Sequence, residues 1–199
     1  MMSSFLPLLL SFSPLYSPVL PAPLFSVVNA LNSSTIMAQA IPENISFENA
    51  IAQTQELVEK MANQSISDTE VEKTITNLVK TENGARGFFV TYLTDERPFV
   101  DSPSPSLIRA LQSSPDIVGE LLVKNLAMSS ATAVAHRRNQ DEAMAKGSEQ
   151  VRDRTLYLIK ATNLPVVNTK LQSLESTLKN GQGQYQAFIE RWGYDDEQK

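Results

Sequence analysis

Residues 114–135 read SPDIVGELLVKNLAMSSATAVA, and this stretch decides the expected fold. Ser114-Pro115-Asp116 is a helix start, with a capping residue, a proline suited to the first turn and an acid near the positive end of the helix dipole. The residues that follow, Ile117 to Ala135, are apolar on nearly all sides and rich in small side chains. This composition is typical of a central helix that neighbouring helices cross closely.

Amphipathic helices are predicted on both sides of this segment, because apolar residues recur there at three- and four-residue spacing. Ser46 is the expected N-cap of the first, and Ser67 with Glu70 forms a capping box at the start of the second. The expected helices are 47–61, 67–79, 105–111, 117–135, 151–162, 166–178 and 185–192. We therefore expect an all-α fold, a compact bundle of about seven helices with short connections.

Residues 85–94, ARGFFVTYLT, are ambiguous because aromatic and β-branched residues favour strands. A strand needs a partner, and the charged part of the chain has no second strand pattern, so helix is predicted by elimination. Asn83-Gly84 is interpreted as the stop signal of the preceding helix. Gly147-Ser148 permits a break and a new cap, and the polar residues before it form either a projecting continuation of the central helix or a loop.

The first 42 residues differ from the rest, since all 17 Lys and Arg, all 22 Asp and Glu and the only His lie at or after Glu43. We divide the chain into an uncharged, Pro-rich leader (1–42), a single helical domain (43–194) and a frayed tail (195–199). The leader is too interrupted by proline to cross a membrane. Three interpretations stay open: a mis-called start with Met37 as the true one, a cleaved targeting segment, or a retained tail.

Composition excludes several classes of site. The absence of cysteine removes disulfides, thiolate zinc sites, iron–sulfur clusters and cysteine nucleophiles. The net charge of −5 argues against nucleic acid as a partner, because nucleic-acid binding draws most of its affinity from cations placed against phosphates. No integral membrane segment, metal or cofactor is expected, and the oligomeric state is open.

One basic stretch, residues 124–160, stands out in this acidic domain. On a continuing helix, Arg137 would pair with Asp141 and Arg138 with Glu142 at i,i+4, which describes an ordinary solvated face. The functional interpretation is that the arginines bind an acidic protein or another anionic partner. The partner-binding candidates are His136, Arg137, Arg138, Arg152 and Arg154.

Other candidates for chemistry are weaker. His136 has no His-Glu-x-x-His or Glu-x-x-His companion, so no metal or catalytic role is assigned to it. Ser129 and Ser130 lack the Gly-x-Ser-x-Gly turn of a hydrolase. Gly84-Ala85-Arg86-Gly87 could present Arg86 and backbone amides to an anion at a helix start, although a C-cap followed by a turn is the simpler interpretation.

The runs Gly84–Leu93 and Lys124–Ser129, with the His136-Arg-Arg-Asn that follows, resemble uncharacterised helical proteins of cyanobacteria. The resemblance implies a cytoplasmic or thylakoid-side location and favours a start at Met37, while the leader keeps secretion open. It brings no activity, cofactor or catalytic residue.

The expected function is therefore a small helical interaction module that docks an acidic or anionic partner through its basic helix region. The alternative is an enzyme or small-ligand-binding protein with a pocket between helices near His136 and Arg86. Whether the chain is an enzyme is left undecided, with the absence of a catalytic motif favouring a binding module.

Overall fold

The N-terminal helices begin where side-chain caps satisfy their first amides. In the computed structural model, which describes residues 45–198, α1 (Phe47–Ala62) follows Ser46, whose hydroxyl accepts from the Asn49 amide. In α2 (Asp68–Val79), Ser67 and Glu70 exchange both bonds of a capping box. Both predicted starts are confirmed. The predicted leader lies outside the described residues.

Residues 85–94 form a helix, as predicted by elimination. α3 (Glu82–Thr94) contains them, and the part of the chain that the structure describes contains no strand. Phe88 stacks on Tyr92 with ring centroids 5.3 Å apart and meets Phe89 edge to face at the same distance. These three rings are buried, so their aromatic character serves the core of a helical protein instead of a sheet.

The stop signal placed at Asn83-Gly84 is wrong. α2 ends at Val79, and Thr81 already caps α3 by accepting a hydrogen bond from the Gly84 amide at 3.1 Å. Gly84 therefore lies in the first turn of α3 and not at the end of α2. A Cβ there would lie 2.1 Å from the Leu78 carbonyl oxygen, so the close approach of α2 is what requires glycine.

The rest of the chain is helical too. A short 3-10 turn, η3 (Pro98–Asp101), leads to α4 (Pro105–Gln112), whose predicted proline start is confirmed and whose N-cap is Ser104. α5 spans Pro115–Arg138, with Pro115 in its first turn, although Ser114 makes no side-chain cap bond. The remaining helices are α6 (Glu142–Thr162), α7 (Pro165–Asn180) and α8 (Gln186–Trp192).

The break expected at Gly147-Ser148 does not occur. Asp141 caps α6 by accepting from the Met144 amide at 3.1 Å, and the helix continues through Gly147 to Thr162. It ends as predicted before Pro165, with Asn163 in the left-handed conformation. The polar residues after α5 are thus a short loop of Asn139 to Asp141, not a projecting helix.

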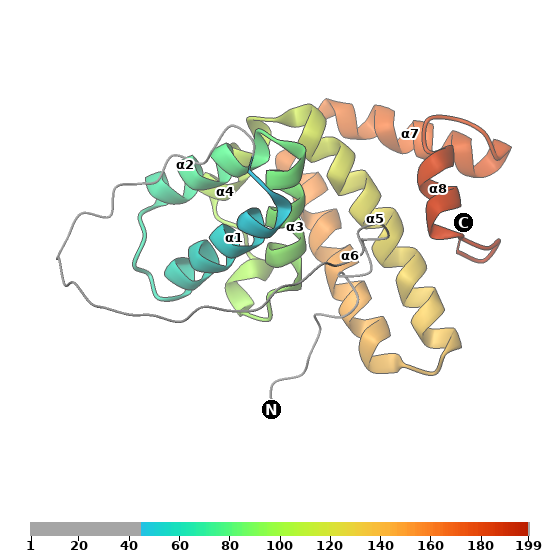
Figure 1. The fold of residues 1–199 in the computed structure, drawn as a ribbon, viewed down its shortest axis with the longest axis horizontal. Helices are drawn as coiled ribbons and strands as arrows, with labels where there is room; N and C mark the ends of the chain where they lie inside the picture. Colours follow the sequence, from blue (N-terminus) through green and yellow to red (C-terminus); the bar gives the residue numbers. More distant parts are fainter. Residues whose placement is uncertain (1–44, 199) are drawn as a thin grey trace, which may run out of the picture. The chain divides into compact units, whose positions relative to one another are not determined.

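The helices form two groups, which Figure 1 shows in blue to green and in yellow to red. In the first group α1 packs on α3 and α2 packs on α4. In the second group α5 packs along α6 and also contacts α7. The two groups meet through α3 and α4, each of which contacts both α5 and α6. The fold is all-α, as predicted, with eight α-helices in the described residues.

Candidate functional site

The end of α5 and the start of α6 carry the predicted basic site. We call Arg137, Arg138 and Arg152 the basic corner. The i,i+4 pairs predicted for the first two are wrong, because α5 ends at Arg138 and Gln140 turns the chain with a φ of 58°. Arg137 and Arg138 therefore pair with carboxylates from other elements.

Arg137 and Arg152 share one carboxylate of α6. The Arg137 Nη2 atom donates to Glu149 Oε1 at 2.7 Å, and Arg152 Nη1 lies 3.6 Å from the same oxygen. Arg137 Nε also lies 3.7 Å from Glu142, and Arg152 Nε donates to Asp153 at 2.9 Å. The side chains of Arg137 and Arg152 are 46% and 33% exposed, and each pairs with carboxylates of α6. The positive charge on this side of the corner is therefore largely neutralised within the chain.

Arg138 binds two carboxylates of the C-terminal turn, which we define as Tyr194–Gln198. Its Nη2 atom donates to Asp195 Oδ1 at 3.0 Å and its Nε atom to Glu197 Oε2 at 2.8 Å, and the guanidinium makes a further bond to each carboxylate. The hydrogen bonds from Arg138 lower the pKa of Asp195 to about 2. The described part of the predicted frayed tail is therefore held against α5, and that prediction is corrected.

Two further contacts fix the C-terminal turn. The Gln198 side-chain amide donates to the Ala131 carbonyl at 3.0 Å, and the Tyr194 ring meets Phe188 of α8 edge to face at 6.1 Å. The Tyr194 hydroxyl is buried and has no hydrogen-bond partner among the described residues. Burying an unpaired hydroxyl costs free energy, so this anchor is less stable than its burial alone suggests.

Arg154 is not part of an exposed basic surface, which corrects its assignment as a partner-binding residue. It is 6% exposed, its Nε atom donates to Asp101 at 2.6 Å, and its Nη1 atom donates to the carbonyls of Leu93 and Asp95 at 2.8 and 2.6 Å. Arg154 thus fastens α6 to the carboxyl end of α3. Sequence spacing could not distinguish it from its neighbour Arg152, because burial of an arginine depends on carbonyls more than fifty residues away.

His136 lies half-buried in the last turn of α5, and its Nε2 atom is buried without a hydrogen-bond partner among the described residues. No group of three or more His, Asp or Glu side chains in residues 45–198 could hold a metal ion. Within residues 45–198 no carboxylate therefore holds Nε2, so the ring lacks the third group that commonly orients a histidine base.

Arg86 packs at the crossing of α1 and α3 and not at an open helix start. Its guanidinium lies 5.2 Å from the centre of the Phe47 ring, a cation–π distance. The neighbouring Gly87 faces α1, where a Cβ would come within 2.4 Å of the Ala50 Cβ atom. The C-cap interpretation of Gly84–Gly87 is wrong, since α2 ends at Val79 and the segment lies within α3. The assignment of Arg86 to an anion stays a prediction.

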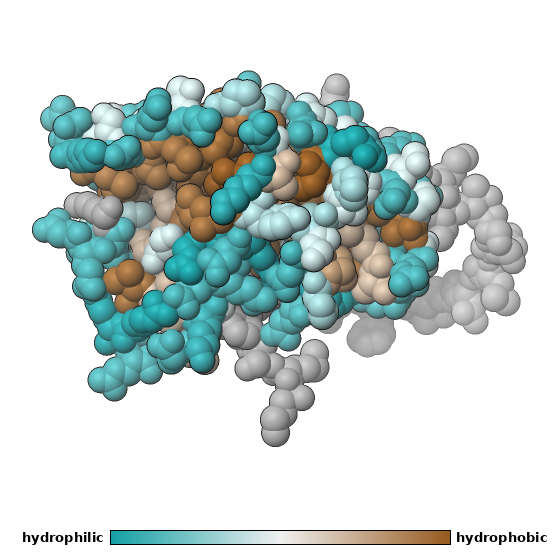
Figure 2. Space-filling view, turned by 180° about the vertical axis from the view of Figure 1, so that it is seen from behind, coloured by the Kyte–Doolittle hydropathy of each residue, from teal (hydrophilic) through white to brown (hydrophobic). Residues whose placement is uncertain are grey.

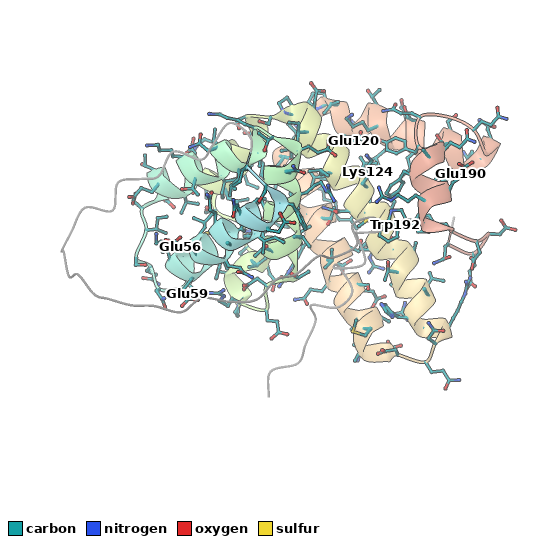
Figure 3. All side chains as sticks on the ribbon, in the orientation of Figure 1. Glu56, Glu59, Glu120, Lys124, Glu190 and Trp192 are labelled. Carbon is teal, nitrogen blue, oxygen red and sulfur yellow. The ribbon has the colours of Figure 1, made fainter. Side chains whose placement is uncertain are left out.

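Sequence reasoning missed a half-buried charge cluster that joins α5, α7 and α8. Glu120 of α5 accepts from Lys170 at 2.8 Å and from the Tyr185 hydroxyl at 3.0 Å, and its other oxygen lies 2.9 Å from Lys124. Figure 3 labels Glu120 and Lys124 one turn apart on α5, on the side of α7 and α8. Lys124 also lies over the Phe188 ring at 5.9 Å.

The surroundings of this cluster shift the pKa values of Glu120 and Tyr185. Burial tends to raise the pKa of Glu120, but the hydrogen bonds from Lys170, Lys124 and Tyr185 outweigh it and lower the pKa. Burial, together with the bond to Glu120, raises the pKa of Tyr185. The glutamate is thus held ionised and the tyrosine neutral. A signal was present in the sequence, because Glu120 and Lys124 are the only charged residues between Asp116 and His136.

A shallow cavity of about 310 Å³ lies along α7 and the loop that follows it. Hydroxyl and amide side chains line it, from Thr169 and Gln172 to Thr177 and Gln184, and its lining includes neither His136 nor Arg86. The cavity therefore does not supply the pocket that the enzyme alternative placed near those two residues.

The central helix is only partly covered. Val118, Leu122 and Val123 in its first half are buried, whereas Leu126 and Met128 further along are half-exposed. Figure 2, which views the molecule from behind, shows apolar side chains gathered into a patch on the face opposite to that seen in Figure 1. By length and composition alone α5 could cross a membrane, a test that the core helix of a soluble protein also passes.

A family model described as uncharacterised conserved protein UCP020893 matches residues 46–199. No curated protein and no solved structure matches the chain significantly. The match covers every described helix and starts at Ser46, the cap of α1.

Proposed function

Because the chain belongs to the family of the uncharacterised conserved protein UCP020893, whose description states no activity, we propose from the geometry that it is a helical interaction module that docks an acidic partner. The docking surface is the basic corner at the end of the α5–α6 pair, with Arg138 as its main contact. Arg154, which is buried, has no part in it.

One observation carries this proposal. Arg138 already binds two carboxylates from a segment 57 and 59 residues away in the chain, through both edges of its guanidinium. An arginine that holds carboxylates in this forked way is suited to a carboxylate-bearing peptide, because its planar donors match two acceptors at once. The side chains of Asp195 and Glu197 are themselves 50% and 69% exposed, so an acidic partner could reach and replace them.

The remaining features favour a binding module over an enzyme. His136 lacks an orienting carboxylate, Arg86 packs on Phe47, and the cavity along α7 has no titratable side chain in its lining. A catalytic site usually combines a pocket with groups of perturbed pKa. The cluster around Glu120 has such groups, yet each of its members is already paired with another.

The proposal is tested by recovering partners from the native organism with tagged wild-type protein and with the double variant Arg137→Gln, Arg138→Gln. The co-eluting proteins are identified by mass spectrometry. The double variant should lose the partner, and recovery of the partner by wild type should fall as salt screens the contact. The matched control, Lys73→Gln with Lys160→Gln, removes two exposed charges elsewhere and should recover the partner as wild type does.

A double variant that recovers every wild-type partner in equal amount would contradict the proposal. In that case the basic corner is a solvated surface whose arginines serve only the chain's own carboxylates.

A further inference from the structure

We propose that the C-terminal turn, Tyr194–Gln198, is a built-in competitor for the acidic partner, and that the basic corner binds a pair of carboxylates two residues apart. This inference rests on the proposed function. It adds the chemistry of the partner, a short acidic peptide with an Asp-x-Glu arrangement, and the means by which the chain limits its own binding.

The carboxylate spacing follows from how the turn sits on Arg138. Asp195 and Glu197 are separated by one residue, and both reach the same guanidinium. Backbone amides of the turn keep the two side chains together, since the amides of Glu197 and Gln198 donate to Asp195 Oδ1 at 3.1 and 3.2 Å. A tight turn therefore presents both carboxylates on one side, and another peptide with this spacing can present the same pair.

The turn occupies the corner without being locked there. Its two ion pairs are exposed, and exposed ion pairs contribute little because water and salt screen them. The Tyr194 hydroxyl is buried without a hydrogen-bond partner among the described residues, which works against closure. The contacts that favour closure include the Gln198 bond to Ala131 and the Tyr194 ring on Phe188. A weakly held segment of this kind can be displaced by a peptide that carries the same charges.

Competition of this type has a measurable size. A partner's apparent affinity is its intrinsic affinity multiplied by the fraction of molecules in which the corner is open, so weakening the closed state raises the apparent affinity. The two exposed ion pairs together shift the equilibrium between the open and closed corner towards the closed state by roughly three- to tenfold. Removing the carboxylates of the turn should therefore tighten peptide binding by about that factor.

The experiment uses full-length protein and a fluorescein-labelled peptide with the sequence of residues 192–199, WGYDDEQK, measured by fluorescence anisotropy. Binding is compared between wild type, the open-turn variant Asp195→Asn with Glu197→Gln, and Arg138→Gln. The matched control is Glu96→Gln with Glu190→Gln, which removes two exposed carboxylates outside the turn. A second peptide with the same two carboxylates changed to amides tests the need for the pair. Circular dichroism melts establish that each variant is folded.

The result expected is that the open-turn variant binds the acidic peptide roughly three- to tenfold more tightly than wild type and the matched control. Arg138→Gln and the amide peptide should both lose binding. If wild type and the open-turn variant bind equally and Arg138→Gln does not bind, acidic docking stands and the competitor role is overturned. If no protein binds the acidic peptide, including the open-turn variant, the basic corner does not dock acidic segments and both proposals fail.

Discussion

The crossing of α1 and α3 depends on Gly87 having no side chain. A Cβ atom at this position would lie 2.4 Å from the Ala50 Cβ atom, 2.9 Å from the Ile51 backbone nitrogen and 3.0 Å from the Ala50 carbonyl carbon. Two of these three neighbours belong to the backbone of α1, which cannot rotate away as the end of a side chain can. Gly87→Ala must therefore push the two helices apart.

The size of the effect follows from two opposing contributions. Overpacking a core costs typically ~1–3 kcal/mol, and alanine regains about 1 kcal/mol over glycine inside a helix. Because the obstruction is backbone, the cost lies towards the upper end, and we expect a net loss of about 1–2 kcal/mol. For a domain of this size the melting temperature should fall by roughly 2–8 °C, measured by circular dichroism.

Gly119→Ala is the matched comparison, since Gly119 lies in α5 where it meets α7. A Cβ there would lie 2.8 Å from the Val166 Cγ1 methyl group and 3.4 Å from a methyl of Val167, both ends of side chains. These methyl groups can shift, so the gain in helix propensity should hold the net change within about 1 kcal/mol. If Gly87→Ala is as stable as wild type, or no less stable than Gly119→Ala, the reasoning about the α1–α3 crossing is refuted.

The remaining predictions concern the leader and the charged groups. A chain that starts at Met37 should melt at the same temperature as the full chain; a drop of several degrees would contradict the predicted boundary. Arg154→Met should lower the free energy of unfolding, measured in urea, by ~2–4 kcal/mol. Two carbonyls at the end of α3 would lose their donor, and the Asp101 carboxylate would lose its partner. A cost as small as that of a surface substitution would contradict the fastening role. Arg137→Ala with Arg138→Ala should shift the melting temperature by no more than roughly 2 °C, since exposed pairs stabilise little; a larger drop would mean that the corner supports the fold. The lowered pKa of Glu120 means that its contribution to stability is present above the ordinary value of 4.5 and is lost as the pH falls through the lower folded value. Below pH 4.5 the melting temperature should therefore fall less steeply with falling pH for Glu120→Gln than for wild type. The same fall in both proteins would contradict the assignment.

Local signals in the sequence predicted four helix starts correctly, because a cap acts within four residues, but they missed the starts of α3 and α6. The caps at Ser46 and Ser67 and the proline starts of α4 and α5 are confirmed. The same rules failed at Gly84, which resembles a helix end but is required by the carbonyl of Leu78. A glycine chosen for close packing and a glycine chosen to end a helix are identical in the sequence.

The candidate site was less predictable, because its geometry depends on where a helix ends and on which distant groups meet. The pairs expected for Arg137 and Arg138 required α5 to continue, and the turn at Gln140 redirected both side chains. The partners of Arg138 lie nearly sixty residues further along the chain, in a segment interpreted as frayed. The partners of Glu120 lie 50 and 65 residues away on α7 and α8. The docking function itself stays a prediction.

The place where the two groups of helices meet has a consequence for how the protein opens. α1 to α4 pack mainly among themselves, as do α5 to α7, and Arg154 is a buried polar link between the two groups. Groups of helices that pack more within themselves than against each other open as separate cooperative units below the free energy of global unfolding. Amide hydrogen exchange should therefore release the carboxyl end of α3 and the facing turn of α6 together, while amides inside each group stay protected. During synthesis α1 to α4 are complete before Arg154 emerges, so the end of α3 stays hydrated until α6 closes on it.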